Sequence, residues 1–110
     1  MGYGLPYFIG AIIDCKMKNK ILIETDGSLM FNLQELATLY SLNKKVKVFI
    51  LNNKGYASIR STQKNYFNSR YLGTGSEDNF FFPDLKLISK TFKFSYYKIS
   101  NSINLKNKIN

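Results

Sequence analysis

Histidine and tryptophan are absent from this 110-residue chain, and cysteine occurs once. The lack of histidine excludes from this chain a Ser–His–Asp triad, a Cys–His nucleophile pair and a histidine-rich zinc site. Cys15 alone cannot form an internal disulfide, so we expect a reducing, cytoplasmic environment. Acidic residues are also scarce, since 7 Asp and Glu stand against 16 Lys and Arg, giving a net charge of +9.

This positive charge favours polyanionic partners such as nucleic acid, phosphorylated ligands or an anionic membrane. Lysine supplies 14 of the 16 cations and is spread along the chain together with 12 asparagines. Such a joint excess is typical of genome base composition rather than of selected charge. The apolar run at residues 5–13 is too short to span a bilayer. We therefore expect neither a nucleic-acid partner nor a membrane partner.

The hydrophobic pattern predicts an α/β domain over residues 1–100 and a polar tail at 101–110. Apolar runs at 21–23 and 46–51 predict two short strands, and helical spacing over 28–42 predicts an amphipathic helix between them. This order favours a parallel pair with a right-handed crossover. The other expected elements are helices at 4–13, 56–63 and 84–92, a functional loop at 64–83 and a third strand at 94–99.

Polar residues follow both predicted strands, with Asp26-Gly27-Ser28 after the first and residues 52–55 after the second. Because the carboxyl ends of parallel strands meet at one edge, we expect these groups to lie close together. A carboxylate, an amide oxygen and a backbone carbonyl suit Mg²⁺, and a helix starting at Ser28 would direct N–H groups at an anion. The alternative is ordinary turn chemistry, because Asp-Gly and Asn-Asn are common turn dipeptides.

The segment DGSLMFNLQELATLYSLNKKVKVFILNNKGY resembles the diphosphate-binding motif of thiamine diphosphate enzymes, which is Gly-Asp-Gly followed at a set distance by Asn-Asn. The 24 residues between Gly27 and Asn52 fall within the spacing of that family. The flanks MGYGLP, NLQELATL and PDLKLISKTF are similar to the acetolactate synthase branch. The resemblance implies a thiamine diphosphate-binding fold, here an incomplete three-layer domain with a parallel sheet flanked by helices. It also implies thiamine diphosphate and Mg²⁺ as cofactors.

Carried over to this sequence, the resemblance implies that Asp26 and Asn53 ligate Mg²⁺ through side-chain oxygens and Gly55 through its backbone carbonyl. The resemblance also implies that Gly27 and Ser28 approach the diphosphate and that Met1 supports the bent shape of the cofactor. Ser58 and Ile59 match positions that face the reacting centre. Met1 is equally explained as the initiating residue. No catalytic residue is assigned, because in the family the Glu that activates the cofactor belongs to another domain, supplied by a partner subunit.

Some positions depart from the family pattern. Thr25 replaces the first Gly of the motif, where its side chain either crowds the phosphate or caps the strand. Thr62 stands where many acetolactate synthases have Trp, so the substrate does not follow from the resemblance. Glu35 is expected to make a structural hydrogen bond. We expect a C-terminal fragment that lacks the first and last strands of its domain, is inactive alone, and joins a pyrimidine-binding domain or subunit in an oligomer.

The function expected from the resemblance is to hold the cofactor diphosphate through Mg²⁺ in an enzyme that makes or breaks a carbon–carbon bond next to a carbonyl. One alternative is a non-functional remnant that keeps the pattern without the activity. Another is an RNA-binding module, because Lys54-Gly55-Tyr56-Ala57 imitates a basic–aromatic strand of RNA-recognition domains. Against it, Ser58 stands where a stacking aromatic residue is needed.

Overall fold

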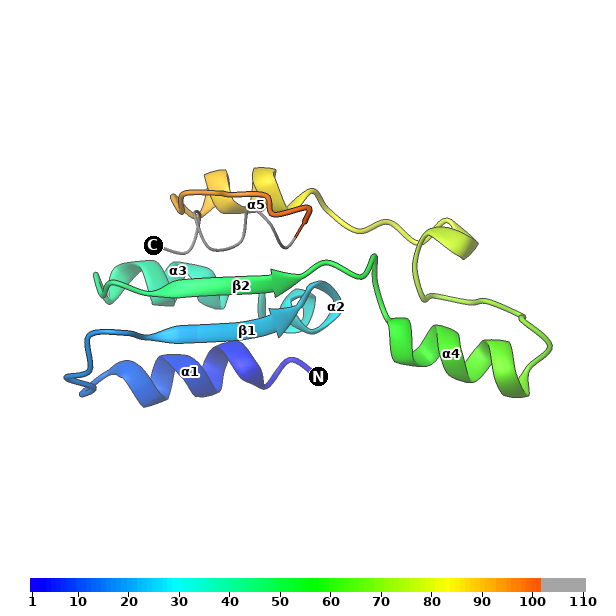
Figure 1. The fold of residues 1–110 in the computed structure, drawn as a ribbon, viewed down its shortest axis with the longest axis horizontal. Coiled ribbons are helices and arrows are strands. Elements are labelled where there is room, and N and C mark those ends of the chain that lie inside the picture. Colours follow the sequence, from blue (N-terminus) through cyan, green and yellow to red (C-terminus); the bar gives the residue numbers. More distant parts are fainter. Residues whose placement is uncertain (102–110) are drawn as a thin grey trace.

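Two parallel strands form the centre of the computed structural model, which describes residues 1–101 (Figure 1). Strand β1, Ile21–Thr25, pairs with β2, Lys47–Leu51, along its whole length, from Ile21 opposite Lys47 to Thr25 opposite Leu51. The predicted parallel pairing is confirmed. Strand β1 runs two residues beyond the apolar run, because Glu24 and Thr25 continue the ladder.

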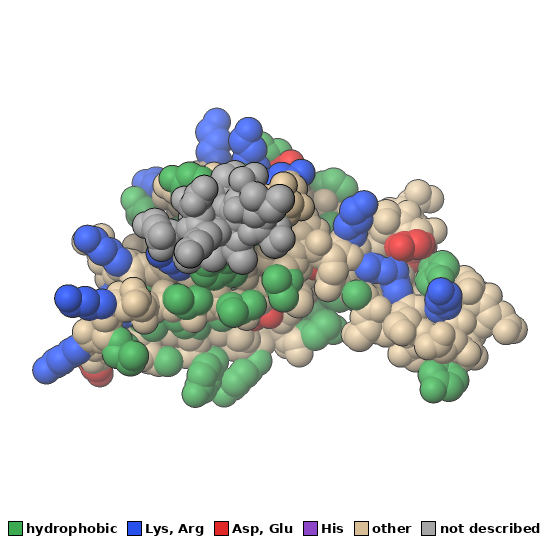
Figure 2. Space-filling view, viewed as in Figure 1, with side chains coloured by type: hydrophobic (Ala, Val, Ile, Leu, Met, Phe, Trp, Pro, Cys, Tyr) green, Lys and Arg blue, Asp and Glu red, His purple; other side chains and the backbone are tan. Residues whose placement is uncertain are grey.

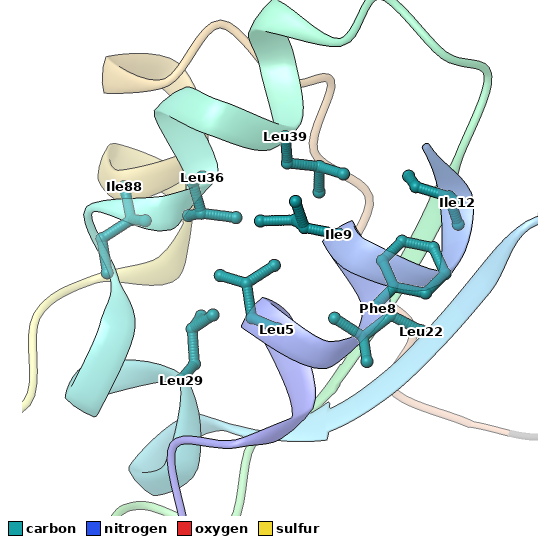
Figure 3. Packing of buried hydrophobic residues seen from close by; sticks show 9 residues of the cluster. All are labelled: Leu5, Phe8, Ile9, Ile12, Leu22, Leu29, Leu36, Leu39 and Ile88. Atoms are coloured by element: carbon teal, nitrogen blue, oxygen red, sulfur yellow. The ribbon is translucent and has the colours of Figure 1, made fainter. Parts of the chain in front are cut away.

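Helix α1, Gly4–Ile12, packs against β1 and against helix α3, Glu35–Ser41. Its apolar residues recur at the three- and four-residue spacing that places them on one face. Figure 3 shows this face inserted between α3 and the strand. The buried cluster consists of Leu5, Phe8, Ile9, Ile12, Leu22, Leu29, Leu36, Leu39 and Ile88.

The two faces of the sheet differ in burial. Leu22 points into the buried cluster, whereas its neighbours Ile21 and Ile23 are 50% and 66% exposed. This alternation is the period of two expected for a strand covered on one side. Hydrophobic side chains accordingly lie exposed along the strands in the space-filling view (Figure 2). The described residues thus form an α/β fold, as predicted, with a small parallel sheet and a layer of packed helices.

The continuous helix predicted over 28–42 is wrong in its start and in its continuity. Helix α2, Asp26–Leu29, begins earlier because the Thr25 hydroxyl caps it by accepting from the Ser28 N–H at 3.3 Å. A 3₁₀ turn, η1 (Met30–Asn32), then separates α2 from α3. The Asn32 amide donates to the Gly2 carbonyl at 2.6 Å, which ties this turn to the N-terminal residues. A tertiary bond of this kind leaves no mark in hydrophobic periodicity.

Helix α4, Ala57–Tyr66, lies beyond the carboxyl end of β2 and projects away from the sheet (Figure 1). It runs three residues beyond the predicted end at 63, into the segment predicted as loop, and none of its residues is buried. A 3₁₀ turn, η2 (Ser76–Asp78), interrupts the rest of that segment. We call residues 56–82, which contain α4 and η2, the arm.

Helix α5, Leu85–Thr91, is capped by Asp84, whose carboxylate accepts from two backbone N–H groups at its start. The strand predicted at 94–99 is wrong, because these residues form no strand in the described chain. Lys93 takes the left-handed conformation (φ 63°), and the Phe94 N–H donates back to the Ser89 carbonyl. This helix-ending motif turns the chain back along α5 (Figure 1).

The predicted tail at 101–110 lies outside the described residues except for Asn101. Within the described part of the chain, every helix is too short or too polar to cross a membrane. Lys and Arg side chains project from several sides of the molecule rather than from one patch (Figure 2). This spread agrees with the interpretation of the charge as a compositional feature.

Candidate functional site

The carboxyl ends of β1 and β2 bring Asp26 and the loop after β2 together, as the strand order predicts. Asp26 is 4% exposed, and its carboxylate accepts from the Gly27 N–H at 2.8 Å and from the Gly55 N–H at 2.9 Å. The second bond joins the residue after β1 to the loop after β2. These two donors fix the carboxylate, and its remaining lone pairs face the loop that carries Asn53.

One terminal atom of the Asn53 amide lies 2.8 Å from Asp26 Oδ1 and 2.5 Å from the Gly55 carbonyl oxygen. With the nitrogen in that place, the amide donates to both oxygens. With the oxygen there, three oxygens converge, and only a cation between them makes the contact favourable. The Gly55 carbonyl also accepts from the Ala57 N–H at 3.2 Å, which leaves one lone pair for this cluster. The side chains of the described residues offer no group of three or more His, Cys, Asp or Glu for a metal.

The backbone of this loop adopts conformations that need particular residues. Lys54 has a φ of 61° and Gly55 a φ of 112°, both in the left-handed region. Gly55 forms an antiparallel bridge with Gly75, and a Cβ on either glycine would collide with the other segment. The Tyr56 N–H donates to the Thr74 carbonyl at 2.9 Å, which continues this pairing. The arm is therefore joined to the site by backbone contacts.

A cleft of about 220 Å³ opens beside the oxygen cluster. It is lined by most of the residues that the sequence singles out for the cofactor, together with neighbours on both strand ends. The lining residues are Met1, Thr25, Gly27, Ser28, Asn53, Gly55, Tyr56, Ala57 and Ser58. Ile59 does not line the cleft, and its side chain is 37% exposed on α4. The structure thus brings together seven of the eight predicted site residues, six in the lining and Asp26 beneath it.

Thr25 and Ser28 have different hydrogen-bonding roles at the start of α2. The Ser28 N–H, which was expected to face an anion, donates to the Thr25 hydroxyl, so Thr25 is the cap of α2. The Ser28 hydroxyl accepts from the Gly2 N–H at 2.8 Å. A hydroxyl that accepts one bond keeps its own proton, and Ser28 can donate it into the cleft.

Tyr56 lines the cleft, and its ring connects the cleft to the rest of the arm. The ring makes edge or tilted contacts with Phe31, Phe80 and Phe82 at centroid distances of 6.0, 6.2 and 5.3 Å. It also lies over Gly27, where an added Cβ would come within 2.7 Å of the ring. Gly27 is therefore required for packing as well as for an open cleft floor.

Two charged residues of the arm were missed at the sequence level. The Arg60 guanidinium donates to the backbone carbonyls of Asn53, Lys54 and Thr74. The Asp78 carboxylate accepts from the N–H groups of Thr74, Gly75 and Phe80. These N–H donors, first of all that of Thr74, lower the pKa of Asp78 below its ordinary value of 3.8. The backbone partners of Arg60 lie 6 to 14 positions away, so no local motif marks Arg60. Those of Asp78 lie within four positions, on either side of η2.

The expectation for Glu35 is confirmed, since its carboxylate accepts from the Thr38 hydroxyl at 2.9 Å. It stands at the start of α3 rather than in the middle of a helix. The RNA-recognition interpretation requires residues 54–57 on a strand. These residues instead form a turn that leads into α4 at Ala57, so the required strand is absent from this described segment.

Comparisons with known proteins agree with this geometry. The family model described as "Thiamine pyrophosphate enzyme, C-terminal TPP binding domain" matches residues 1–110. The chain is 33% identical over 109 residues to the acetolactate synthase large subunit of Cyanidium caldarium, covering 99% of this chain and 18% of that protein.

Two further relatives give the same result. The chain is 34% identical over 92 residues to the acetolactate synthase isozyme 2 large subunit of Escherichia coli (strain K12), covering 84% of this chain and 16% of that subunit. An acetolactate synthase of Arthrospira platensis is 40% identical over 78 residues, covering 71% of this chain and 14% of the relative. The chain therefore spans less than a fifth of the length of these relatives. The parallel strands and the oxygen cluster agree with the match of the family model to residues 1–110. The chain therefore belongs to the thiamine pyrophosphate enzymes, as their C-terminal TPP-binding domain.

Proposed function

We propose that the chain holds the diphosphate of thiamine diphosphate through Mg²⁺ bound by Asp26, Asn53 and the Gly55 carbonyl. The observation that carries the proposal is the position of the Asn53 amide at the ends of two parallel strands, where one of its terminal atoms lies 2.5 Å from the Gly55 carbonyl oxygen and 2.8 Å from Asp26 Oδ1. Neighbouring oxygen ligands of an octahedral Mg²⁺ lie about 3 Å apart, given metal–oxygen distances of about 2.1 Å. One carboxylate and two neutral oxygens form a hard donor set that suits this ion.

The surroundings of the oxygen cluster also suit a diphosphate. Three protein ligands leave positions on the ion for phosphate oxygens and water, which Mg²⁺ retains readily. Asn53 is exposed and lines the cleft together with Gly27 and Ser28. Met1 and Ser58 line the same cleft and are proposed to contact the rest of the cofactor.

The wider activity is proposed from the relatives named acetolactate synthase. Bound thiamine diphosphate supplies a carbanion-stabilising ylid for making or breaking a carbon–carbon bond next to a carbonyl. In that chemistry the residues of this chain bind and orient the diphosphate end. Glu35 does not line the cleft, so we propose that a pyrimidine-binding domain of the same family supplies the activating Glu.

Thermal unfolding of the full chain tests the proposal. A melt is recorded alone, with thiamine diphosphate and Mg²⁺, and with EDTA in place of the metal. Ligand at 100 times its Kd adds about 2.7 kcal/mol, which raises the Tm of a domain of this size by on the order of 10 °C. Inorganic diphosphate with Mg²⁺ is expected to reproduce part of the shift.

Variants identify the site in the same experiment. Asn53→Ala and Asp26→Ala are expected to abolish the Mg²⁺-dependent shift, whereas Asn65→Ala, at an exposed asparagine of α4, should keep it. Asn53 is the sharper variant because its side chain is exposed and its removal disturbs little packing. A cooperative melt that ignores both ligands would contradict the proposal. A melt without cooperativity would support the remnant interpretation instead.

A further inference from the structure

The Arg60 guanidinium lies between the loop after β2 and the segment around Thr74, and it donates to three backbone carbonyls. Nη1 donates to the carbonyls of Lys54 and Thr74, each at 2.8 Å, and Nη2 donates to the carbonyl of Asn53 at 2.6 Å. The Arg60 side chain is 16% exposed. Charge-assisted bonds of this kind are stronger than neutral ones, and partial burial shields them from water.

Two of these three bonds fix the backbone conformation of Lys54. The Asn53 carbonyl belongs to the peptide group before Lys54, and the Lys54 carbonyl belongs to the peptide group after it. Both peptide planes are therefore held by one rigid group. A left-handed φ of 61° at a residue with a side chain is strained, and it persists where the surroundings determine it. Arg60 restrains both carbonyls, and Asn52 Oδ1 accepts from the Lys54 N–H at 3.2 Å.

The same restraint sets the direction of two oxygens in the cluster. Asn53 and Gly55 flank Lys54, so the conformation of Lys54 decides whether the Asn53 side chain and the Gly55 carbonyl converge on Asp26. The third bond, to Thr74, fastens this loop to the strand-like segment that carries Gly75. Gly75 makes room for the guanidinium, because an added Cβ would lie 2.7 Å from Nη1.

The contacts require arginine rather than any cation. The planar fork of a guanidinium presents several donors at fixed angles, whereas a lysine ammonium is a single point that cannot span three carbonyls in this arrangement. Glu77 Oε1 lies 3.6 Å from Arg60 Nε, and the Glu77 side chain is 41% exposed. Exposed ion pairs contribute little, so the carbonyl bonds rather than Glu77 carry the effect.

We propose that Arg60 is a positioning residue of the cation site, directing the Asn53 amide and the Gly55 carbonyl toward Asp26 by holding the carbonyls of Asn53, Lys54 and Thr74. The proposal rests on the proposed function for its ligand. Its structural part concerns the loop alone and is tested without any ligand.

The ligand-free test is amide hydrogen exchange on the full chain. The reporters are the N–H groups of Gly55 and Tyr56, which donate to Asp26 and Thr74. The reference is the N–H of Lys47, which donates to the Lys20 carbonyl in the sheet. In Arg60→Gln, exchange at the reporters is expected to rise at least about tenfold while the reference is unchanged. Equal acceleration at all three amides, or none at the reporters, would overturn the proposal.

The ligand test measures binding of Mn²⁺, in place of Mg²⁺, with thiamine diphosphate by electron paramagnetic resonance. Arg60→Gln is expected to weaken Mn²⁺ binding by about 10- to 100-fold, as loss of a group supporting metal ligands does. Arg60→Lys should recover part of the loss. Two controls should bind as the unaltered chain does: Glu77→Gln keeps the carbonyl bonds, and Lys64→Gln removes an exposed charge from the same helix.

The outcomes separate the two proposals. If the unaltered chain binds no Mn²⁺ with the cofactor, the proposed function fails, and the exchange experiment still decides the role of Arg60 in the loop. If the unaltered chain binds Mn²⁺ and Arg60→Gln binds it equally well, the positioning role is overturned and the proposed function stands. Equal weakening in Lys64→Gln would point to net charge instead and would also overturn the role of Arg60.

Discussion

The part of the molecule around the sheet and the arm at residues 56–82 are stabilised in different ways. Around the sheet, nine hydrophobic residues form one buried cluster. In the arm, the buried residues among those described are Thr74 and Gly75, and α4 buries none. The arm is held instead by bonds of Arg60 and Asp78 to the backbone and by ring contacts of Tyr56.

This difference separates stability from site geometry. Removing water from apolar surface is non-directional and sets how firmly the chain folds, whereas hydrogen bonds to particular carbonyls set where a segment lies. The cleft lies at the junction, with Thr25 and Gly27 from the sheet side and Tyr56 and Ser58 from the arm. Changes in the arm can therefore alter the cleft without unfolding the core.

The largest expected effect comes from breaking the core. Leu5 is 1% exposed and lies within the buried cluster (Figure 3). Leu5→Ala is expected to lower the free energy of unfolding by about 3 kcal/mol, through lost burial and the cavity left behind. Urea unfolding followed by circular dichroism measures it. Leu87→Ala, at a 64% exposed leucine of α5, should stay within about 0.5 kcal/mol of the unaltered chain; equal losses in both variants would contradict the assignment of the core.

A smaller and more local effect is expected from Gly75→Ala. The φ of Gly75 is 153°, and an added Cβ would collide with the Lys54 carbonyl and lie 2.7 Å from Arg60 Nη1. A cost of about 2 kcal/mol is expected, confined to the arm and its junction. Amide exchange at Tyr56 should accelerate while the sheet stays protected. Gly73→Ala is the matched control, since no atom lies within 4 Å of its added Cβ, and it should cost about 1 kcal/mol for its φ of 66° alone.

The smallest expected effect is a pH dependence of the hydrogen bonds that Asp78 accepts in the arm. A carboxyl whose pKa is lower in the folded chain stabilises the fold above the unfolded pKa, and this stabilisation is lost as the pH falls through the folded pKa. The pKa of Asp78 is lowered chiefly by the Thr74 N–H, so the contacts of Asp78 should weaken below about pH 4. Amide chemical shifts of Thr74 and Phe80 between neutral and acid pH report this change, and Asp78→Asn should remove most of it. Shifts that move equally in both proteins would assign the effect to another group.

The sequence predicts most elements of both regions, including α4 within three residues of its bounds, but it misses features that depend on tertiary bonds. Apolar runs and helical spacing depend on local patterns, and they predict the paired strands, α1 and α5. The meeting of Asp26 with the loop after β2 follows from the parallel order. The break at η1 and the absence of a strand at 94–99 depend instead on tertiary bonds, such as that of Asn32 to Gly2, and on the left-handed Lys93.

Arg60 shows why part of the site could not be predicted. In the sequence it is one of the 16 basic residues of the chain, and it lies on a predicted helix with no neighbour that distinguishes it. Its proposed role depends on a bond to a carbonyl 14 positions away, which only the folded chain brings within reach. Thr25 is a milder case. Its two expected roles were crowding the phosphate or capping the strand, and the structure gives it a third, the cap of α2.

If the proposed Mg²⁺ site is correct, the Asn53 amide has a consequence for how fast the cation enters it. Hydrogen bonds from its nitrogen can hold the carboxylate and the carbonyl together before any ion arrives, so uptake needs only a half-turn of one exposed amide group. Rotations of exposed side chains take picoseconds to nanoseconds, and the entropy of ordering the loop has already been lost in folding. Mg²⁺ gives up its own water slowly by comparison. The rate of filling such a site is then set by the ion and not by the protein.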